Sequence, residues 1–111
     1  MLRTDLWVAA FLRRHNDIGH ICVVSRRGDA IAGQIFIEID HLNGQVSLLT
    51  PAPATSREDG DADRLFVRRF DHAEPETVRG RIAREVEFDP DLWVVSLEMR
   101  GEDPGVTLAR D

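Results

Sequence analysis

The chain lacks lysine altogether, and all 14 of its basic residues are arginine. Without lysine the protein has no Schiff-base lysine, no lysine general base and no P-loop lysine for phosphate binding. Its acidic residues number 20, which gives a net charge of −6. A negative charge of this size disfavours non-specific binding to a polyanion. The composition therefore excludes lysine-dependent catalysis and makes a general nucleic-acid-binding role less favourable.

Cysteine and long apolar runs are also scarce. The single cysteine, Cys22, cannot form an internal disulfide, and its place in the apolar run 21–24 predicts a buried, unreactive thiol. No apolar run approaches the roughly 18 residues of a membrane-spanning helix. The first residues do not show the pattern of a signal peptide. We expect one cytoplasmic domain over residues 1–100, with no membrane segment and no cofactor.

A calcium-binding loop is suggested by one acidic stretch but is incomplete. Asp59, Asp61 and Asp63 alternate as in such a loop. Arg64 and Phe70, however, stand where the loop needs a glycine for its sharp turn and a glutamate to close the cage. The stretch 51–63, rich in proline, alanine and acids, is therefore expected to be a mobile acidic loop.

The four histidines show no recognised zinc-binding spacing. They lack the helical i, i+4 pair of a zinc protease and a cysteine pair to complete a cage. Two partial ligand sets remain, His20 with Cys22, and Asp71 with His72 and Glu74. We interpret both sets as isolated capping or surface residues. The sequence therefore predicts no metal site.

A β-hairpin is the clearest local feature. Alternation over residues 31–39 places one face of a strand inward, formed by Ile31, Gly33, Ile35, Ile37 and Ile39. Asn43-Gly44 predicts a two-residue type I′ turn. That turn sets a register that pairs His41 with Val46, Ile39 with Leu48, and Ile37 with Thr50. The other face would carry Phe36, Glu38, Asp40, Ser47 and Leu49, and we expect it to be partly covered.

The remaining elements follow from periodicity and end signals. Helices are expected at 5–15, capped by Thr4, and at 75–87, where Val78, Ile82 and Val86 form a buried stripe. Further strands are expected at 21–25, 64–70 and 91–98, and a flexible tail at 101–111. In the strand at 64–70, Leu65 and Val67 share one face, and Phe66 and Phe70 share the other.

Together these elements predict an α+β fold in the order αββββαβ. We expect two layers, with an antiparallel five-stranded sheet and both helices packed mostly on one side of it.

Four segments of the chain resemble a small bacterial family, domain of unknown function 1491. They are RTDLWVAAFLRR, GDAIAGQIFIEI, LTPAP and FDPDLWVVSLE. The resemblance extends over most of residues 3–100. The resemblance supports the integrity of the fold, and it implies no substrate, cofactor or catalytic residue.

The leading functional hypothesis is a non-enzymatic protein-interaction or regulatory module. Its partner surface would lie on the half-apolar hairpin face, at Phe36, Leu49 and Pro51. The identity of such a partner protein does not follow from the sequence.

The alternative is an RNA-binding domain that uses arginines and nearby aromatic rings. Arginines can pair with phosphates while aromatic rings stack on bases. The residues proposed for this role are Arg64, Phe66, Arg68, Arg69, Phe70 and Arg79, with Arg81 and Arg84 on the same charged stretch.

A third hypothesis is an enzyme whose site is assembled from Asp40, His41 and residues 54–63. The expected register places His41 on the opposite face from Asp40 and Ser47, so that these neighbours cannot form a serine triad. No catalytic residue is therefore predicted.

Overall fold

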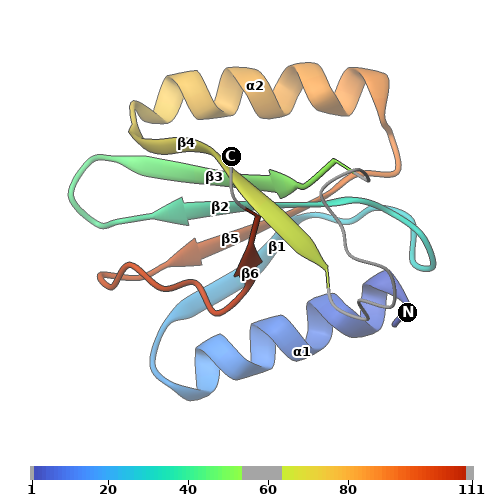
Figure 1. Cartoon of the computed structure of the whole chain (residues 1–111), viewed down its shortest axis with the longest axis horizontal. Helices are drawn as coiled ribbons and strands as arrows, with labels where there is room; N and C mark the ends of the chain where they lie inside the picture. Colours follow the sequence, from blue (N-terminus) through green and yellow to red (C-terminus); the bar gives the residue numbers. More distant parts are fainter. Residues whose placement is uncertain (1, 54–63, 110–111) are drawn as a thin grey trace.

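The computed structural model describes residues 2–53 and 64–109, which form two helices and six strands (Figure 1). The helices are α1 (Thr4–Asp17) and α2 (Pro75–Phe88). The strands are β1 (Ile21–Arg26), β2 (Ile35–Asp40), β3 (Val46–Pro51), β4 (Leu65–Ala73), β5 (Trp93–Glu98) and β6 (Thr107–Leu108). The expected mobile loop lies mostly at 54–63, outside the described residues.

All six strands belong to one mixed sheet, in the order β1-β5-β2-β3-β4-β6. Strands β2 and β5 are parallel, as are β4 and β6, and the other neighbours are antiparallel. The prediction of five antiparallel strands was therefore wrong in number and direction. Strand β5 returns from α2 and enters the sheet between β1 and β2, which are consecutive in the sequence. A connection through a helix permits parallel pairing of this kind.

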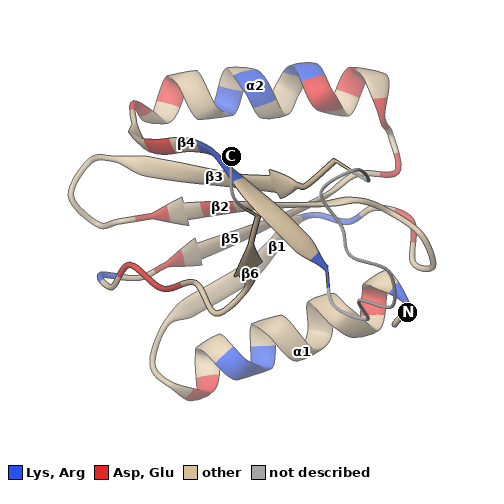
Figure 2. Cartoon of the chain, in the orientation of Figure 1, with Lys and Arg blue, Asp and Glu red and all other residues tan. Residues whose placement is uncertain are grey.

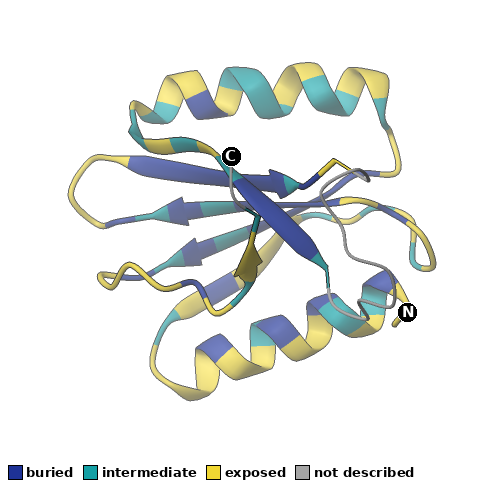
Figure 3. Cartoon of the chain, viewed as in Figure 1, coloured by how far each residue is buried: buried dark blue, intermediate teal, exposed yellow. Residues whose placement is uncertain are grey.

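The helices lie on opposite faces of the sheet, so the fold has three layers (Figure 1). Val8 and Phe11 of α1 pack on one face, and Val78 of α2 packs on the other. The expectation of two layers with both helices on one side was wrong. The residues of β3 show why a helix is needed on each face. Leu48 and Leu49 face opposite cores, and both are 0% exposed. A sheet that is apolar on both faces must be covered on both (Figure 3).

The isoleucine face of the hairpin is inward, as predicted, but the register differs by one residue. Ile35, Ile37 and Ile39 are all buried, whereas Ile31 precedes β2 and is 64% exposed. Ile39 lies opposite Ser47 and Ile37 opposite Leu49. The predicted pairs, in which Ile37 faced Thr50, are therefore corrected.

The turn explains the shift in register. The backbone N–H of His41 donates to the Gln45 carbonyl at 3.1 Å, so residues 42–44 form the connection. Leu42 and Gly44 both have positive φ values, 63° and 87°. The Asp40 carboxylate accepts a hydrogen bond from the Leu42 N–H at 2.8 Å, which supports this uncommon leucine conformation. The chain thus uses a longer connection than the predicted two-residue turn.

The helices lie where periodicity predicted them. Val78 is buried, and Ile82 and Val86 pack beside it on the second core. Thr4, however, is the first residue of α1 and not its side-chain cap. Its hydroxyl donates instead to the Gly33 carbonyl at 2.9 Å. In the described chain, neither helix is long and apolar enough to cross a membrane.

Residues 101–109 are part of the fold, which corrects the expectation of a flexible tail. Pro104 is buried, Val106 packs against the first core, and β6 pairs with β4. A backbone hydrogen bond from Ala109 to Phe66 extends this pairing at 2.7 Å. The segment crosses from the end of β5 to the far edge of the sheet (Figure 1).

The other edge strand, β1, is partly closed by a side chain. The Asn16 amide group of α1 accepts from the Cys22 N–H at 3.0 Å and donates to the Cys22 carbonyl at 2.9 Å. Both backbone groups of Cys22 are therefore used. The thiol of Cys22 is buried, as predicted, and burial raises its pKa to about 11.

Candidate functional site

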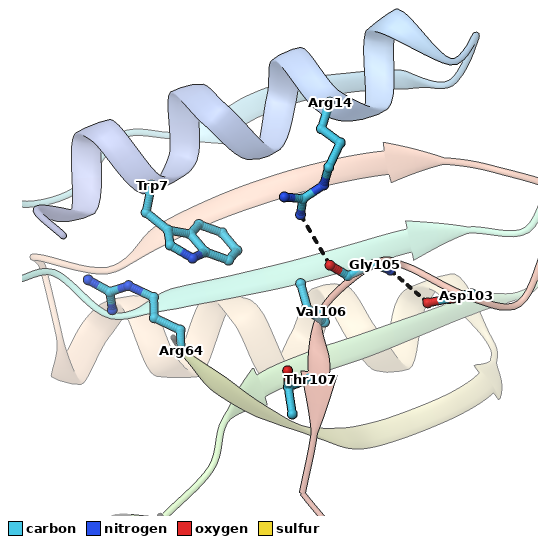
Figure 4. A pocket seen from close by; sticks show the side chains of 7 residues that line it. All are labelled: Trp7, Arg14, Arg64, Asp103, Gly105, Val106 and Thr107. Atoms are coloured by element: carbon cyan, nitrogen blue, oxygen red, sulfur yellow. Dashed lines mark hydrogen bonds between the residues drawn. The ribbon is translucent and has the colours of Figure 1, made fainter. Parts of the chain in front are cut away.

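A pocket of about 330 Å³ lies between α1 and the C-terminal segment (Figure 4). Trp7 and Arg14 belong to α1, and Arg64 is the residue directly before β4. The segment that the sequence suggested to be a tail supplies the other wall, at Asp103, Gly105, Val106 and Thr107. Three parts of the chain that are distant in sequence therefore form this one concavity.

Both arginines are held by specific contacts. Arg14 Nη2 donates to the Gly105 carbonyl at 3.1 Å, and its guanidinium lies 5.6 Å from the centre of the Phe11 ring. Arg64 Nη2 donates to Thr4 Oγ1 at 2.6 Å. The same threonine hydroxyl donates to the Gly33 carbonyl, so a buried group positions Arg64. The two cations are thus fixed on the scaffold before any ligand binds.

The pocket is locally positive on an acidic protein. Its lining has two guanidinium groups and one carboxylate, that of Asp103, which accepts a hydrogen bond from the Gly105 N–H at 2.8 Å. Trp7 adds an aromatic wall, since its ring stacks on Phe11 with the ring centres 5.1 Å apart. Guanidinium groups bind carboxylates and phosphates with well-defined geometry. The arrangement therefore suits a small organic anion.

A second group of polar residues lies at the end of the sheet where β2 and β5 finish. His41 follows β2, Ser47 belongs to β3, and Asp71 and His72 belong to β4. The imidazole rings of His41 and His72 are stacked, with centres 3.8 Å apart. Glu102 approaches from the segment after β5, and its Oε1 lies 3.4 Å from His72 Nε2.

This group corrects the prediction that His41 and Ser47 cannot meet. His41 Nε2 lies 2.7 Å from Ser47 Oγ, and both residues are buried. Ser47 Oγ also accepts a hydrogen bond from the backbone N–H of His72 at 3.0 Å. The one-residue change in register brings Ser47 to the same side as His41. Asp40 uses its carboxylate in the turn and does not join them.

The protonation of this group follows from its surroundings. Burial lowers the pKa of His41, and the neighbouring His72 lowers it further, so His41 is neutral at pH 7. The hydrogen bond from His72 lowers the pKa of Asp71, which is therefore a carboxylate. Because a carboxylate accepts, His72 Nδ1 is the donor in its 2.6 Å contact with Asp71 Oδ1.

The residues proposed for a partner surface do not share an exposed face. Phe36 is 7% exposed and lies beneath α2, whereas Leu49 is 0% exposed and lies in the core beneath α1. Pro51 ends β3 and is half-buried. The incorrect register had placed Phe36 and Leu49 on one side.

The residues proposed for RNA binding are similarly dispersed. Phe66 is 1% exposed in the first core, and Phe70 packs against the second core, so the rings form no common platform. The pairing between β3 and β4 is irregular near Leu48 and Leu49, and the side chains of Phe66 and Phe70 lie on opposite faces of the sheet. Arg64 lines the pocket, whereas Arg68 lies 3.7 Å from the Asp71 carboxylate and Arg69 is exposed.

Helix α2 does not add a basic face. Its acidic and basic residues are interspersed (Figure 2). Arg81 donates to Glu85 at 2.8 Å, and Arg79 and Arg84 are exposed on the same helix. RNA binding therefore stays a prediction that these positions do not strengthen.

The two partial metal-ligand sets are not assembled as the sequence grouped them. His20 Nδ1 lies 2.9 Å from His15 Nδ1, while the Cys22 thiol is buried in the core. Glu74 precedes α2 as its N-cap. The calcium-like acids at 59–63 and the loop half of the proposed enzyme site lie outside the described residues.

Sequence reasoning missed the contributions of Asp103 and Glu102 because it assigned both to a tail. A weak signal was present in Val106, because β-branched residues are uncommon in a purely solvated segment. The pairing of β6 with β4 is a contact between segments some 40 residues apart, and local patterns do not encode it.

The fold and the pocket define a small α/β/α sandwich domain with a mixed sheet. The chain belongs to the DUF1491 family, whose description is protein of unknown function and whose model matches residues 2–106. Among curated proteins, none is similar enough to count as a relative.

Solved structures support the same assignment. A DUF1491 family protein from Caulobacter crescentus, determined by crystallography, is 31% identical, with a TM-score of 0.81. The match covers 97% of this chain and 99% of that one. A solution structure from A. tumefaciens is 33% identical, with a TM-score of 0.85, and the match covers 99% of this chain and 96% of that one.

Proposed function

We propose that this chain is a cytoplasmic, non-enzymatic regulatory module that binds a small organic anion, a carboxylate or a phosphate monoester, in the pocket between α1 and the C-terminal segment. The observation that carries this proposal is that Arg14 and Arg64, which are 50 residues apart in sequence, both line one cavity, on either side of Trp7 (Figure 4). Each is positioned by its own hydrogen bond to the scaffold.

The charge distribution favours a small anion over a nucleic acid. The whole chain carries a charge of −6, which repels a long polyanion. The pocket lining is positive by one charge, counting Arg14, Arg64 and Asp103, and its size suits a ligand of a few carbon atoms. A small anion can bind at the positive lining of the pocket without contacting the acidic residues elsewhere on the surface.

The same geometry supports a regulatory role better than a predicted partner-protein surface. Residues of the pocket tie the middle of α1 to the segment that ends in β6. An anion held in the pocket would contact both α1 and this segment and would hold them together more firmly. Binding of the anion would thereby stabilise the position of β6.

The test is calorimetric titration of the full chain with a series of probes, including succinate, citrate and glycerol phosphate. At least one probe should bind, and Arg14→Gln should weaken it about 10- to 100-fold, the loss expected for one charged hydrogen bond. Arg84→Gln, on exposed α2, is the matched control and should leave the affinity unchanged. Equal affinities in the two variants, or no binding by any probe, would contradict the proposal.

A further inference from the structure

Each of the stacked histidines at the end of the sheet has one ring nitrogen in a supporting contact and the other outside it. In metal sites, a histidine uses one ring nitrogen for the ion and the other for a supporting hydrogen bond. His72 donates from Nδ1 to Asp71, which leaves the lone pair of Nε2 available. His41 contacts Ser47 through Nε2, which leaves Nδ1.

His41 Nδ1 is the unexplained atom of this group. The residue is only 6% exposed, and Nδ1 is buried with no hydrogen-bond partner in the part of the chain that the structure describes. A buried polar atom without a partner is costly and rare in folded proteins. Coordination of a metal ion would satisfy it.

A third ligand completes the group. One donor atom from each of His41, His72 and Glu102 lies within 4.8 Å of the others. The 3.4 Å between His72 Nε2 and Glu102 Oε1 matches the separation of about 3.4 Å between two ligands that lie about 2.1 Å from a tetrahedral ion. We propose that His41, His72 and Glu102 bind a divalent transition-metal ion of the Zn²⁺ class, with Ser47 and Asp71 orienting the imidazoles.

Binding requires one local adjustment. The two rings lie within 11° of parallel, so their lone pairs cannot yet aim at a single point. The buried His41 is fixed, whereas the side chain of His72 is 28% exposed and that of Glu102 is 72% exposed. A tilt of His72 and a closing movement of Glu102 bring the three donors around one ion.

The donor set indicates which ions fit. Two imidazoles and a carboxylate suit Zn²⁺, Co²⁺ and related ions, whereas Ca²⁺ and Mg²⁺ prefer oxygen ligands alone. Three protein ligands leave a fourth position for water. The proposed metal site and the anion pocket share no residue, although Glu102 of the one is followed in the chain by Asp103 of the other.

The experiment uses the full, untagged chain after treatment with a chelator and desalting. Zn²⁺ titration by calorimetry should give one ion per chain, and Co²⁺ should give the visible absorption of a four-coordinate site. His72→Asn should weaken Zn²⁺ binding by at least about 100-fold, beyond the usual effect of a supporting residue. Asparagine tolerates the positive φ of 53° at this position, so the fold should persist.

Further variants separate the site from incidental binding. Glu102→Gln, on an exposed side chain, should weaken binding and remove the Co²⁺ absorption. His20→Asn and Glu87→Gln remove a histidine and a glutamate elsewhere and should bind as the unmodified chain does. Absence of binding overturns the proposal. So does binding that survives His72→Asn or Glu102→Gln, or binding that is lost in His20→Asn.

Discussion

Gly33 lies where the connection between β1 and β2 passes against β5. A Cβ at this position would lie 2.5 Å from the Asp91 carbonyl oxygen and 2.8 Å from Cδ1 of Trp93. The Trp93 indole is itself fixed by donation to the Asp29 carbonyl at 2.7 Å. Neither neighbour can move freely, so only glycine fits.

Two alanine substitutions test this close approach. Gly33→Ala should lower the free energy of unfolding by about 2–3 kcal/mol, because overpacking against backbone is not easily relieved. Gly80→Ala, where nothing lies within 4 Å in the middle of α2, should raise it by about 0.5–1 kcal/mol. Urea unfolding of the two variants measures both changes. An unchanged free energy of unfolding in Gly33→Ala would show that the neighbouring atoms can move to make room for a methyl group.

At the residue scale, prediction succeeded for the alternating isoleucines of the hairpin. It failed at the turn, where the backbone φ of one residue changed the pairing of the two strands. The alternation of Ile35, Ile37 and Ile39 was sufficient to place that face inward. The positive φ of Leu42 was not predictable, since a leucine rarely adopts it, and it moved the register by one residue. That single residue decides whether His41 meets Ser47.

At the scale of elements, β3 shows why both faces of the sheet are core. Leu48 packs with Phe36 and Val78 beneath α2, and the adjacent Leu49 packs with Phe66 beneath α1. Sequence periodicity predicted the two helices and most strands from neighbouring residues. It could not show on which face each helix packs, because that depends on contacts between distant segments.

Truncation of either leucine should therefore be costly. Leu48→Ala and Leu49→Ala should each reduce the free energy of unfolding by about 2–5 kcal/mol, since each leaves a cavity in a closed core. Val23→Ala on β1, where the valine is 50% exposed, is the control and should change it by less than about 0.5 kcal/mol. Denaturant unfolding measures all three. A small effect for one leucine alone would indicate a sheet covered on one side.

At the scale of the whole molecule, the first helix and the last segment are joined through His15. Its Nε2 donates to the Pro104 carbonyl at 2.7 Å, and its Nδ1 accepts from His20 at 2.9 Å. Arg14 and Asp103 are the charged groups nearby. Sequence analysis found each segment but not this link, because 89 residues separate the two partners.

This link should make stability depend on pH. Burial lowers the pKa of His15 below its ordinary value of 6.5. The unfolded chain therefore takes up a proton near pH 6.5 that the folded chain resists. Stability is retained above that pH and falls as the pH drops below it, by at most about 1.4 kcal/mol per pH unit for one histidine.

Thermal or urea unfolding between pH 7.5 and 5, with EDTA present, measures the dependence. His15→Gln should reduce the slope in this range, while the slope that remains belongs to the other titrating groups. An unchanged slope in His15→Gln would show that His15 does not contribute.

The contact between Asn16 and Cys22 has a consequence for crowded solutions. Edge strands with open backbone groups recruit strands from other molecules, and the product grows into aggregates. On β1 the apolar side chains of Ile21 and Val23 are exposed. Next to them, the Asn16 amide group of α1 forms hydrogen bonds with the backbone N–H and carbonyl of Cys22. At Cys22, the side chain of Asn16 therefore occupies the backbone groups with which a strand of another molecule would pair.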